Sequence, residues 1–510
     1  MLNITHKNIN HLKILILMVG CFISVYSLFF FITNKVYLIG SDAFYYMALS
    51  DSLLDNGIMR DIVTIPSGDI KTPQNGIVFV HLILSLLGIG AKGKILSIVI
   101  FNYLLYISGV YPLYKIASIL GLNNNLRLVI LQSVYLSAWH IYRINLLIIN
   151  DGIFNSLILW FIYLIIMFVK HVDILKSFSF PKHILLKLSV IFLLEVALIQ
   201  FRLNIILVIM SALISLLLVK KFKAFVYLTG CSLLLIISVI SIFSFIEVTH
   251  LKNSGIDHFF NMFYAINVSY IKLQLWKILP RLILGISGLS NPLLSLFFLV
   301  FPLSTIYFGI RGIVEKNFIK IFLTMICLTG LWFTMHFQNA RLIWYTFPFF
   351  YLIILTLKRV RYVGLIFVLL IYLQSFQQFY IGIARVPESK LFLYMYENNI
   401  SLPINNPLLL TSKARHAYFL LNTRSYRVSD ASDGILDGKI VFPVNFNWDL
   451  IVIRKTLFIL GDREFINSAY SQIHDMAISN GYTLESHPLT PYLDEFEGWA
   501  LAQIKLKQKI

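Results

Sequence analysis

Apolar residues in this chain gather into long runs that alternate with short polar segments. The runs are roughly 16–25 residues long, the length at which a helix crosses about 30 Å of hydrocarbon. We therefore predict an all-α polytopic membrane protein that crosses the bilayer about eleven times. The predicted spans cover residues 11–33, 95–118, 127–142, 152–169, 185–200, 203–219, 224–246, 292–310, 318–335, 342–357 and 362–381.

The composition supports a membrane protein and excludes other classes. Of the 510 residues, 58% are hydrophobic and only 13% are charged, whereas soluble domains carry about 25% charged residues. A net charge of +18 would suggest a nucleic-acid partner for a soluble protein. Here the basic loops account for it, so we expect no nucleic acid. The three cysteines, Cys21, Cys231 and Cys327, lie in apolar runs, and the sequence implies no disulfide framework.

The short loops alternate in charge, and this sets the predicted orientation. By the positive-inside rule the basic loops and the N-terminus are cytoplasmic. The loop 34–94, the loop 247–291 and the chain after Tyr380 are then extracytoplasmic. Residues 76–90 are apolar but short, and counting them as a span would invert every later loop. We expect an interfacial or re-entrant helix there.

The amino-acid pattern changes near Pro387, where the long apolar runs stop. Short β-like runs follow at 407–410 and 450–453, and 464–479 has the pattern of an amphipathic helix. We predict a small mixed α/β domain on the outer face. The predicted domains are a transmembrane domain over 1–385, including the first outer loop 34–94, and an extracytoplasmic domain over 386–510.

One glycine pattern resembles a nucleotide-binding motif but lacks its context. Gly88, Gly90 and Gly93 have the G-x-G-x-x-G spacing, which requires a strand before it and a helix after it. Here an apolar membrane segment precedes the glycines and a predicted span follows. Ile95 also stands where a P-loop needs Ser or Thr. We predict no nucleotide site at this position.

Acidic residues at the predicted outer surface are the first candidates for chemistry. Asp42 stands just after the first span, where it can cap a helix over 43–56 or act as a general base. Asp151 opens a later span, where it can again cap a helix or serve as a metal ligand. Asp51 and Asp55 lie four residues apart on one helical face and are expected to be solvated.

Several segments, in their order along the chain, resemble the GT-C superfamily of membrane glycosyltransferases. These enzymes use polyprenyl-phosphate-linked sugars and include protein mannosyltransferases and aminoarabinose transferases. The segments are DAFYYMALSDSLLDNG with the later Pro66 and KTPQNG, then NDGIF, FRLNIIL and NARLIWYTFPFFYLIIL. The resemblance implies a GT-C-like fold in which Asp42 is the catalytic acid after the first span and Asp151 is a second acid. It places Arg202 in an element similar to the family's "R-P" element, and Arg341 in one similar to its "R-Y…P" element.

The chain departs from the family pattern at three positions. Ala43 follows Asp42, where many members have a second acidic residue. Thr72 stands between Lys71 and Pro73, where many members have Lys-Pro-Pro, and Leu203 rather than proline follows Arg202. The resemblance therefore fixes neither the donor sugar nor a cofactor. A divalent metal ion, if one is used, would be held by Asp42 and Asp151.

The chemistry explains why such residues are needed at the bilayer surface. Outside the cytoplasm there is no nucleotide-sugar pool, so a sugar donor must carry its own activation on a lipid phosphate. Asp42 can take the proton of the attacking acceptor, and arginines can stabilise the leaving phosphate by bidentate hydrogen bonds. A single displacement inverts the anomeric configuration. The candidates for the donor phosphate are Arg202, Arg341, Lys71, Arg143 and Arg281.

Other polar residues keep more than one interpretation. The arginines can simply snorkel to lipid headgroups, and His336 can be a polar interface residue rather than a catalyst. Glu195 lies midway along a predicted span, where a carboxylate marks a functional site by default. It can pair with Lys187 or Arg202, or hold helices together. Tyr45 and Tyr46 can belong to the aromatic belt or stack on a sugar ring.

The sequence as a whole predicts an inverting glycosyltransferase in a bacterial inner membrane. It would move a sugar from a polyprenyl-phosphate carrier to a glycan, lipid or protein acceptor on the outer face. One alternative is a polymerase or ligase that uses lipid-diphosphate-linked glycans. Another is a transporter or flippase, which would show repeated halves and broken central helices; no internal repeat is present in the sequence.

Overall fold

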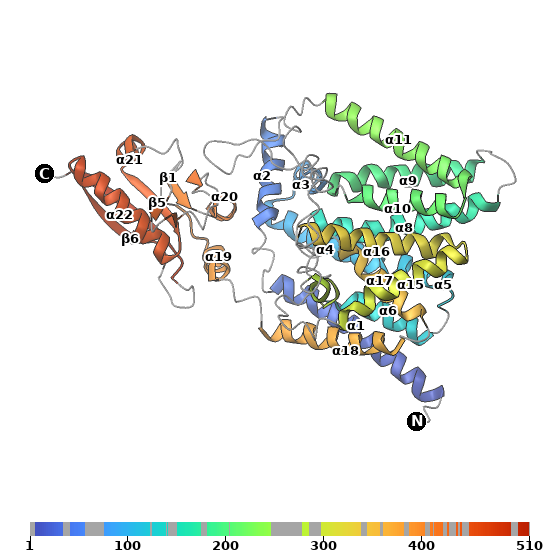
Figure 1. Cartoon of the computed structure of the whole chain (residues 1–510). Coiled ribbons are helices and arrows are strands. Elements are labelled where there is room, and N and C mark those ends of the chain that lie inside the picture. Colours follow the sequence, from blue (N-terminus) through green and yellow to red (C-terminus); the bar gives the residue numbers. More distant parts are fainter. Residues whose placement is uncertain are drawn as a thin grey trace. The chain divides into compact units, whose positions relative to one another are not determined.

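The chain divides into two compact units. The first comprises Met1–Phe31, Lys71–Ile77 and Ile95–Tyr380, and the second comprises Ile32–Ile70, Val78–Lys94 and Ile381–Ile510. The structure is a computed structural model (Figure 1). It describes residues 6–33, 41–56, 76–122, 125–138, 140, 150–174, 181–202, 204–245, 278–284, 297–337, 344–357, 361–381, 387–402, 408–411, 413–421, 426–427, 435–436, 439–440, 448–490 and 498–508.

The first unit is built from apolar helices, among which α8, α9, α10 and α16 lie side by side (Figure 1). The apolar runs of the sequence account for these helices. In an apolar environment the backbone N–H and C=O groups must bond to one another, and a helix satisfies them within its own segment. The helices are α1 (His6–Thr33), α4 (Ala91–Ser108), α5 (Val110–Ile119), α6 (Asn125–Ser137), α8 (Asn150–Ile174), α9 (Lys182–Phe201), α10 (Ile205–Leu218), α11 (Phe222–Phe245), η3 (Phe297–Leu299), α15 (Val300–Val314), α16 (Phe318–Phe337), α17 (Phe347–Thr356) and α18 (Arg361–Ile381).

The prediction of a polytopic, helical membrane protein is confirmed. Among the described residues, five helices are long and apolar enough to cross a membrane. They are Lys13–Thr33, Gly93–Ile119, Asn150–Ile174, Lys182–Phe201 and Phe297–Val314. Shorter apolar helices occupy the remaining predicted spans, and the count of eleven crossings stays a prediction.

Polar side chains join the helices of the first unit at a few buried points. Ser133 of α6 and Tyr372 of α18 both donate to the carbonyl of Ile16 in α1, at 2.8 and 3.0 Å. The hydroxyl of Tyr135 donates to the carbonyl of Tyr106 at 3.1 Å. Polar side chains of membrane helices form hydrogen bonds with neighbouring helices, since lipid offers them no partner. These bonds therefore fix α1, α6 and α18 to one another, and α4 to α6.

The apolar stretch 76–90 contains a short helix, and its interfacial or re-entrant placement stays a prediction. Its helix α3 (Gly76–Leu86) has 11 residues, which at 1.5 Å each gives a length of about 17 Å, short of the ~30 Å of hydrocarbon. The chain then turns at Gly88, whose φ of 75° suits glycine, and α4 follows. The glycines spaced like a nucleotide motif therefore join two helices rather than a strand and a helix.

The second unit contains the five-stranded mixed sheet β2-β1-β5-β7-β6. Strand β1 pairs in parallel with β2 and β5, whereas β7 pairs antiparallel with β5 and β6. This confirms a small mixed α/β part at the C-terminal end. The strands are β1 (Leu408–Thr411), β2 (Tyr426–Arg427), β5 (Thr456–Gly461), β6 (Tyr482–Pro488) and β7 (Ala500–Gln508), and a separate hairpin joins β3 (Ile435–Leu436) to β4 (Lys439–Ile440).

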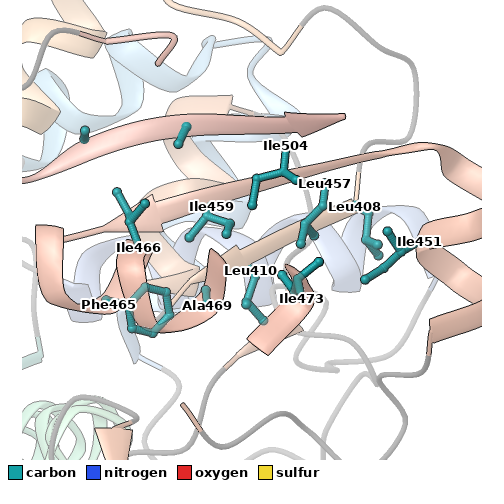
Figure 2. Close-up of a cluster of buried hydrophobic side chains, with 12 residues drawn as sticks. Leu408, Leu410, Ile451, Leu457, Ile459, Phe465, Ile466, Ala469, Ile473 and Ile504 are labelled. Carbon is teal, nitrogen blue, oxygen red and sulfur yellow. The ribbon is translucent and has the colours of Figure 1, made fainter. Parts of the chain in front are cut away.

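Helices cover both faces of this sheet, because β5 is buried at every position and apolar over 457–460. Leu457 and Ile459 face one core, which α22 (Arg463–Ser479) completes with Phe465 and neighbouring apolar residues (Figure 2). Phe458 and Leu460 face the opposite core. A continuous apolar run is typical of a strand buried on both sides. The second core is completed by α19 (Pro387–Glu397) and α20 (Ala414–Leu421).

Two sequence predictions in this region have different outcomes. The amphipathic helix predicted at 464–479 is present as α22, and the side chain of Asp462 caps it by accepting from Phe465 N at 2.8 Å. The β-like run predicted at 450–453 is wrong. These residues lie in the helix α21 (Trp448–Arg454), and the strand β5 begins only at Thr456. Four apolar residues do not distinguish a strand from a buried helix.

Candidate functional site

The clearest polar feature of the first unit is a buried ion pair between Asp151 and Arg202. Asp151 is the second residue of α8, and Arg202 directly follows the last residue of α9. Arg202 Nη2 donates to Asp151 Oδ2 at 2.5 Å, and the two side chains are 15% and 3% exposed. A charge-assisted bond of this length is among the stronger hydrogen bonds in proteins. The pair therefore holds the guanidinium at the joined ends of two apolar helices.

The start of α8, which carries Asp151, is also bonded to the start of α3. Asn150 is fully buried, and its Oδ1 accepts from Ile77 N, at the start of α3, at 3.0 Å. Gly76 lies directly against Phe201, because a Cβ on Gly76 would stand 2.5 Å from Phe201 Cδ1. Glycine is therefore required where the KTPQNG segment ends. Asn150 and Gly76 were not among the predicted site residues, although Asn150 begins the NDGIF segment and Gly76 ends the KTPQNG segment.

The second unit contains the helix that carries Asp42. The predicted helix is present as α2 (Ser41–Asn56), and Asp42 is its second residue. The side chain of Asp42 lies outside the described residues. Tyr45 and Tyr46 are buried, with ring centroids 6.0 Å apart, so the structure places both rings in the protein interior.

Asp51, further along α2, is not solvated as predicted. Its Oδ1 lies 3.5 Å from Lys94 Nζ of α4, and the two side chains are 34% and 11% exposed. Burial raises the pKa of the Asp51 carboxyl above its ordinary value, while Lys94 acts in the opposite direction. Asp55 is exposed, as predicted. This ion pair could not be predicted from local pattern, because its partners are 43 positions apart in the chain.

Glu195 is fully buried in α9 and is bonded to the neighbouring helix α11. Ser232 Oγ donates to Glu195 Oε1 at 3.4 Å, and Cys231 Sγ donates to Oε2 at 3.8 Å. Of the partners considered from the sequence, Arg202 instead binds Asp151. The geometry therefore favours the interpretation in which Glu195 holds helices together.

The remaining candidates are not brought together by the described part of the chain. Arg281 is exposed in the helical segment 278–284. His336 is the penultimate residue of α16, and its side chain lies outside the described residues, as do Lys71, Arg143 and Arg341. Among the described side chains, no three His, Cys, Asp or Glu residues gather as metal ligands.

Comparison with solved structures assigns the fold. The chain is similar to the apo oligosaccharyltransferase of Archaeoglobus fulgidus, with a TM-score of 0.53 and 12% identity over 91% of this chain and 71% of that one. AglB of the same organism, in complex with an inhibitory peptide and a dolichol-phosphate, matches with a TM-score of 0.49 and 11% identity over 92% and 71% of the two chains. ArnT of Cupriavidus metallidurans bound to undecaprenyl phosphate matches with a TM-score of 0.44 and 11% identity over 94% and 98%.

The match to the apo oligosaccharyltransferase, at a TM-score of 0.53, confirms the resemblance at the level of the fold. The oligosaccharyltransferase is a GT-C superfamily member, and the chain therefore has a GT-C-like, polytopic membrane fold. No protein-family model and no curated protein matches the sequence. At such low identity the likeness establishes the architecture, and the activity has to be argued from the residues.

Proposed function

We propose that this protein is an inverting glycosyltransferase that moves a sugar from a polyprenyl-phosphate carrier to an acceptor on the outer face of the membrane. The buried Arg202–Asp151 pair, in a chain with the fold of an oligosaccharyltransferase, is the observation that carries this proposal. A cation fixed at the ends of two apolar helices is suited to an anionic lipid headgroup. The alternating charge of the loops supports a site on the outer face of an inner membrane, with a cytoplasmic N-terminus.

In the proposed reaction an acceptor oxygen or nitrogen attacks the anomeric carbon of the donor sugar. Asp42 takes the proton from the attacking group. The bond between the anomeric carbon and the phosphate oxygen breaks, and the lipid phosphate leaves with an additional negative charge. Arg202, together with Arg341, stabilises that charge. Asp151 fixes the plane of the Arg202 guanidinium, so that its orientation is set before the phosphate binds.

Of the two residues that would hold a divalent metal ion, Asp151 is already engaged by Arg202, and the side chain of Asp42 lies outside the described residues. The Asp151 carboxylate is 3% exposed and accepts from Arg202 at 2.5 Å. A divalent cation at the same carboxylate would face the positive guanidinium at short range. We therefore derive no step through a metal ion, and assign to Asp151 the role of orienting Arg202.

The decisive experiment measures sugar transfer by the purified full-length protein in lipid, with a panel of polyprenyl-phosphate sugars. The key comparison is between the native chain and Asp42→Asn. Asp55→Asn is the matched control, because it removes an exposed carboxylate from the same helix. We expect transfer from at least one donor, its loss in Asp42→Asn, and its retention in Asp55→Asn.

Other outcomes would redirect the proposal. Transfer that survives in folded Asp42→Asn would leave the enzyme class standing and remove Asp42 as the base. Transfer from lipid-diphosphate glycans alone would instead indicate the polymerase or ligase. Failure to transfer from any donor of either kind would contradict the proposed function.

A further inference from the structure

Helix α2 is held within the second unit by a contact with α20. The ring of Phe44 meets the imidazole of His416 edge-on, with centroids 5.1 Å apart and an interplanar angle of 71°. Phe44 is 1% and His416 is 5% exposed. Both rings are therefore excluded from solvent, and the contact is a packed joint rather than a surface encounter.

The imidazole of His416 also packs on the core of the sheet. The ring stacks on Phe392 of α19 at 4.4 Å with an interplanar angle of 17°, and Phe392 meets Trp499 at 6.3 Å. Phe392 is fully buried and Trp499 is 8% exposed. We call Phe44, Phe392, His416 and Trp499 the His416 joint. Within it, one imidazole lies between α2 and the aromatic residues of the C-terminal core.

The start of α20 is itself fixed to the sheet. The hydroxyl of Thr411, at the end of β1, donates to the Leu460 carbonyl of β5 at 2.7 Å and accepts from Lys413 N at 3.0 Å. His416 follows within one turn of helix, and Ala417 packs in the core beneath it. The imidazole consequently has a rigid support, and that support passes to α2 through Phe44.

Phe44 stands two residues after Asp42, in the first turn of α2. Any rotation or shift of that turn moves both residues, because a helix transmits such motion along its hydrogen-bonded backbone. We infer that His416 is a positioning residue: the C-terminal sheet uses its ring to fix the first turn of α2, and with it the proposed base Asp42. This inference rests on the proposed function for the role of Asp42, and on the ring geometry for the joint.

The test separates ring packing from imidazole chemistry. His416→Phe keeps an aromatic ring and removes both nitrogens, whereas His416→Ala removes the ring. Phe44→Ala breaks the same contact from the α2 side. Tyr482→Ala is the matched control, because Tyr482 belongs to another aromatic contact of the same sheet, with Trp448 at 6.1 Å.

For the full-length protein in lipid we expect kcat to fall by up to about 10²-fold in His416→Ala and Phe44→Ala, since misplacing a reacting group by about 1 Å has an effect of this size. The KM for the donor should stay close to native. His416→Phe and Tyr482→Ala should keep kcat and its pH profile. Native kcat in folded His416→Ala would overturn the inference, as would His416→Phe being as slow as His416→Ala.

Hydrogen–deuterium exchange provides a readout that needs no donor. Amides in residues 41–56 should exchange faster in His416→Ala and Phe44→Ala than in the native chain. In Tyr482→Ala their exchange rates should equal those of the native chain. If exchange is unchanged in all variants, the inference fails, whether or not transfer persists. If the native chain transfers no sugar but exchange in α2 responds as described, the joint stands and the proposed function fails.

Discussion

Arg202 and Asp151 lie at the ends of two consecutive helices and meet at 2.5 Å, with the carboxylate side chain only 3% exposed. Asp151 is at the start of α8 and Arg202 is at the end of α9. The two residues are therefore far apart in the sequence, and the packing of the two helices brings them together. The negative charge also stands at the N-terminal end of α8, where a helix favours it. Removing either partner would take away the close counter-charge of the other, poorly exposed side chain.

Asp151→Ala is therefore expected to lower the free energy of unfolding by about 3–5 kcal/mol, the range for breaking a buried pair. Lys221→Met is the control, because it removes a more exposed pair with Asp173 of the same unit, worth about 0–1 kcal/mol. Thermal unfolding of the two variants in lipid or detergent compares these effects. Equal shifts in Tm for both variants would contradict a special role for the buried pair.

Arg202→Lys should reduce transfer while keeping the charge, because lysine lacks the planar fork that arginine presents to a carboxylate or phosphate. Arg311→Lys makes the same change at an exposed arginine of α15 and should leave transfer unaltered. Initial rates at saturating donor measure the difference. Native rates in Arg202→Lys would mean that charge alone, without the fork geometry, suffices at this position.

Asp51 should contribute more to the free energy of unfolding as the pH falls from neutral towards about 4. Burial raises the pKa of its carboxyl above 3.8, Lys94 lowers it and Asp55 raises it further. The folded chain then takes up this proton at a pH at which the unfolded chain is still ionised, so stability rises as pH falls through the folded pKa towards 3.8. The difference in Tm between the native chain and Asp51→Asn should shift in favour of the native chain between neutral pH and about pH 4.

Glu485 provides the opposite case in the same unit. Hydrogen bonds from Lys507 and His487 lower the pKa of its carboxyl. Its contribution is present above its ordinary pKa and is lost as pH falls through the folded pKa. The difference in Tm between the native chain and Glu485→Gln should therefore move in the other direction. Parallel pH dependences for Asp51→Asn and Glu485→Gln would contradict the assignment of burial as the main cause at Asp51.

Gly76→Ala should disturb the junction between the first outer loop and α9. Its Cβ would stand 2.5 Å from the Phe201 ring, and overpacking of this kind costs about 1–3 kcal/mol. Gly230→Ala is the control, since nothing lies within 4 Å of a Cβ there. Phe201→Leu in the Gly76→Ala background should restore part of the lost Tm. No rescue would indicate that the defect lies in the backbone rather than in the ring contact.

Glu195 should behave as a hydrogen-bond acceptor that joins α9 to α11. A double-mutant cycle of Glu195→Ala and Ser232→Ala is expected to give a coupling of about 0.6 kcal/mol, with an upper value of about 1.7 kcal/mol, as for other hydrogen bonds between membrane helices. Glu195→Gln keeps an oxygen that can accept from Ser232, and should stay close to the native Tm. A coupling of zero would leave the 3.4 Å contact without energetic significance.

The sequence was sufficient for the helical membrane architecture, because long apolar runs have one solution in a bilayer. It also identified α2 and α22, whose polar first turns and apolar periodicity are local signals. It failed at 450–453, where the apolar run is too short to show a period. Asp51–Lys94 and Phe44–His416 could not be predicted, since their partners are separated by long stretches of chain and are brought together only by tertiary packing.

The sheet of the second unit ends in β2, which has two residues, on one side and in β6 on the other. Glu485, His487 and Pro488 occupy β6, and short strands, charges and proline at an edge all oppose the addition of another strand. Chains anchored in one bilayer share a surface, so their extramembrane domains collide far more often than those of dissolved proteins. Edges of this kind oppose the joining of sheets between copies that crowd in one membrane.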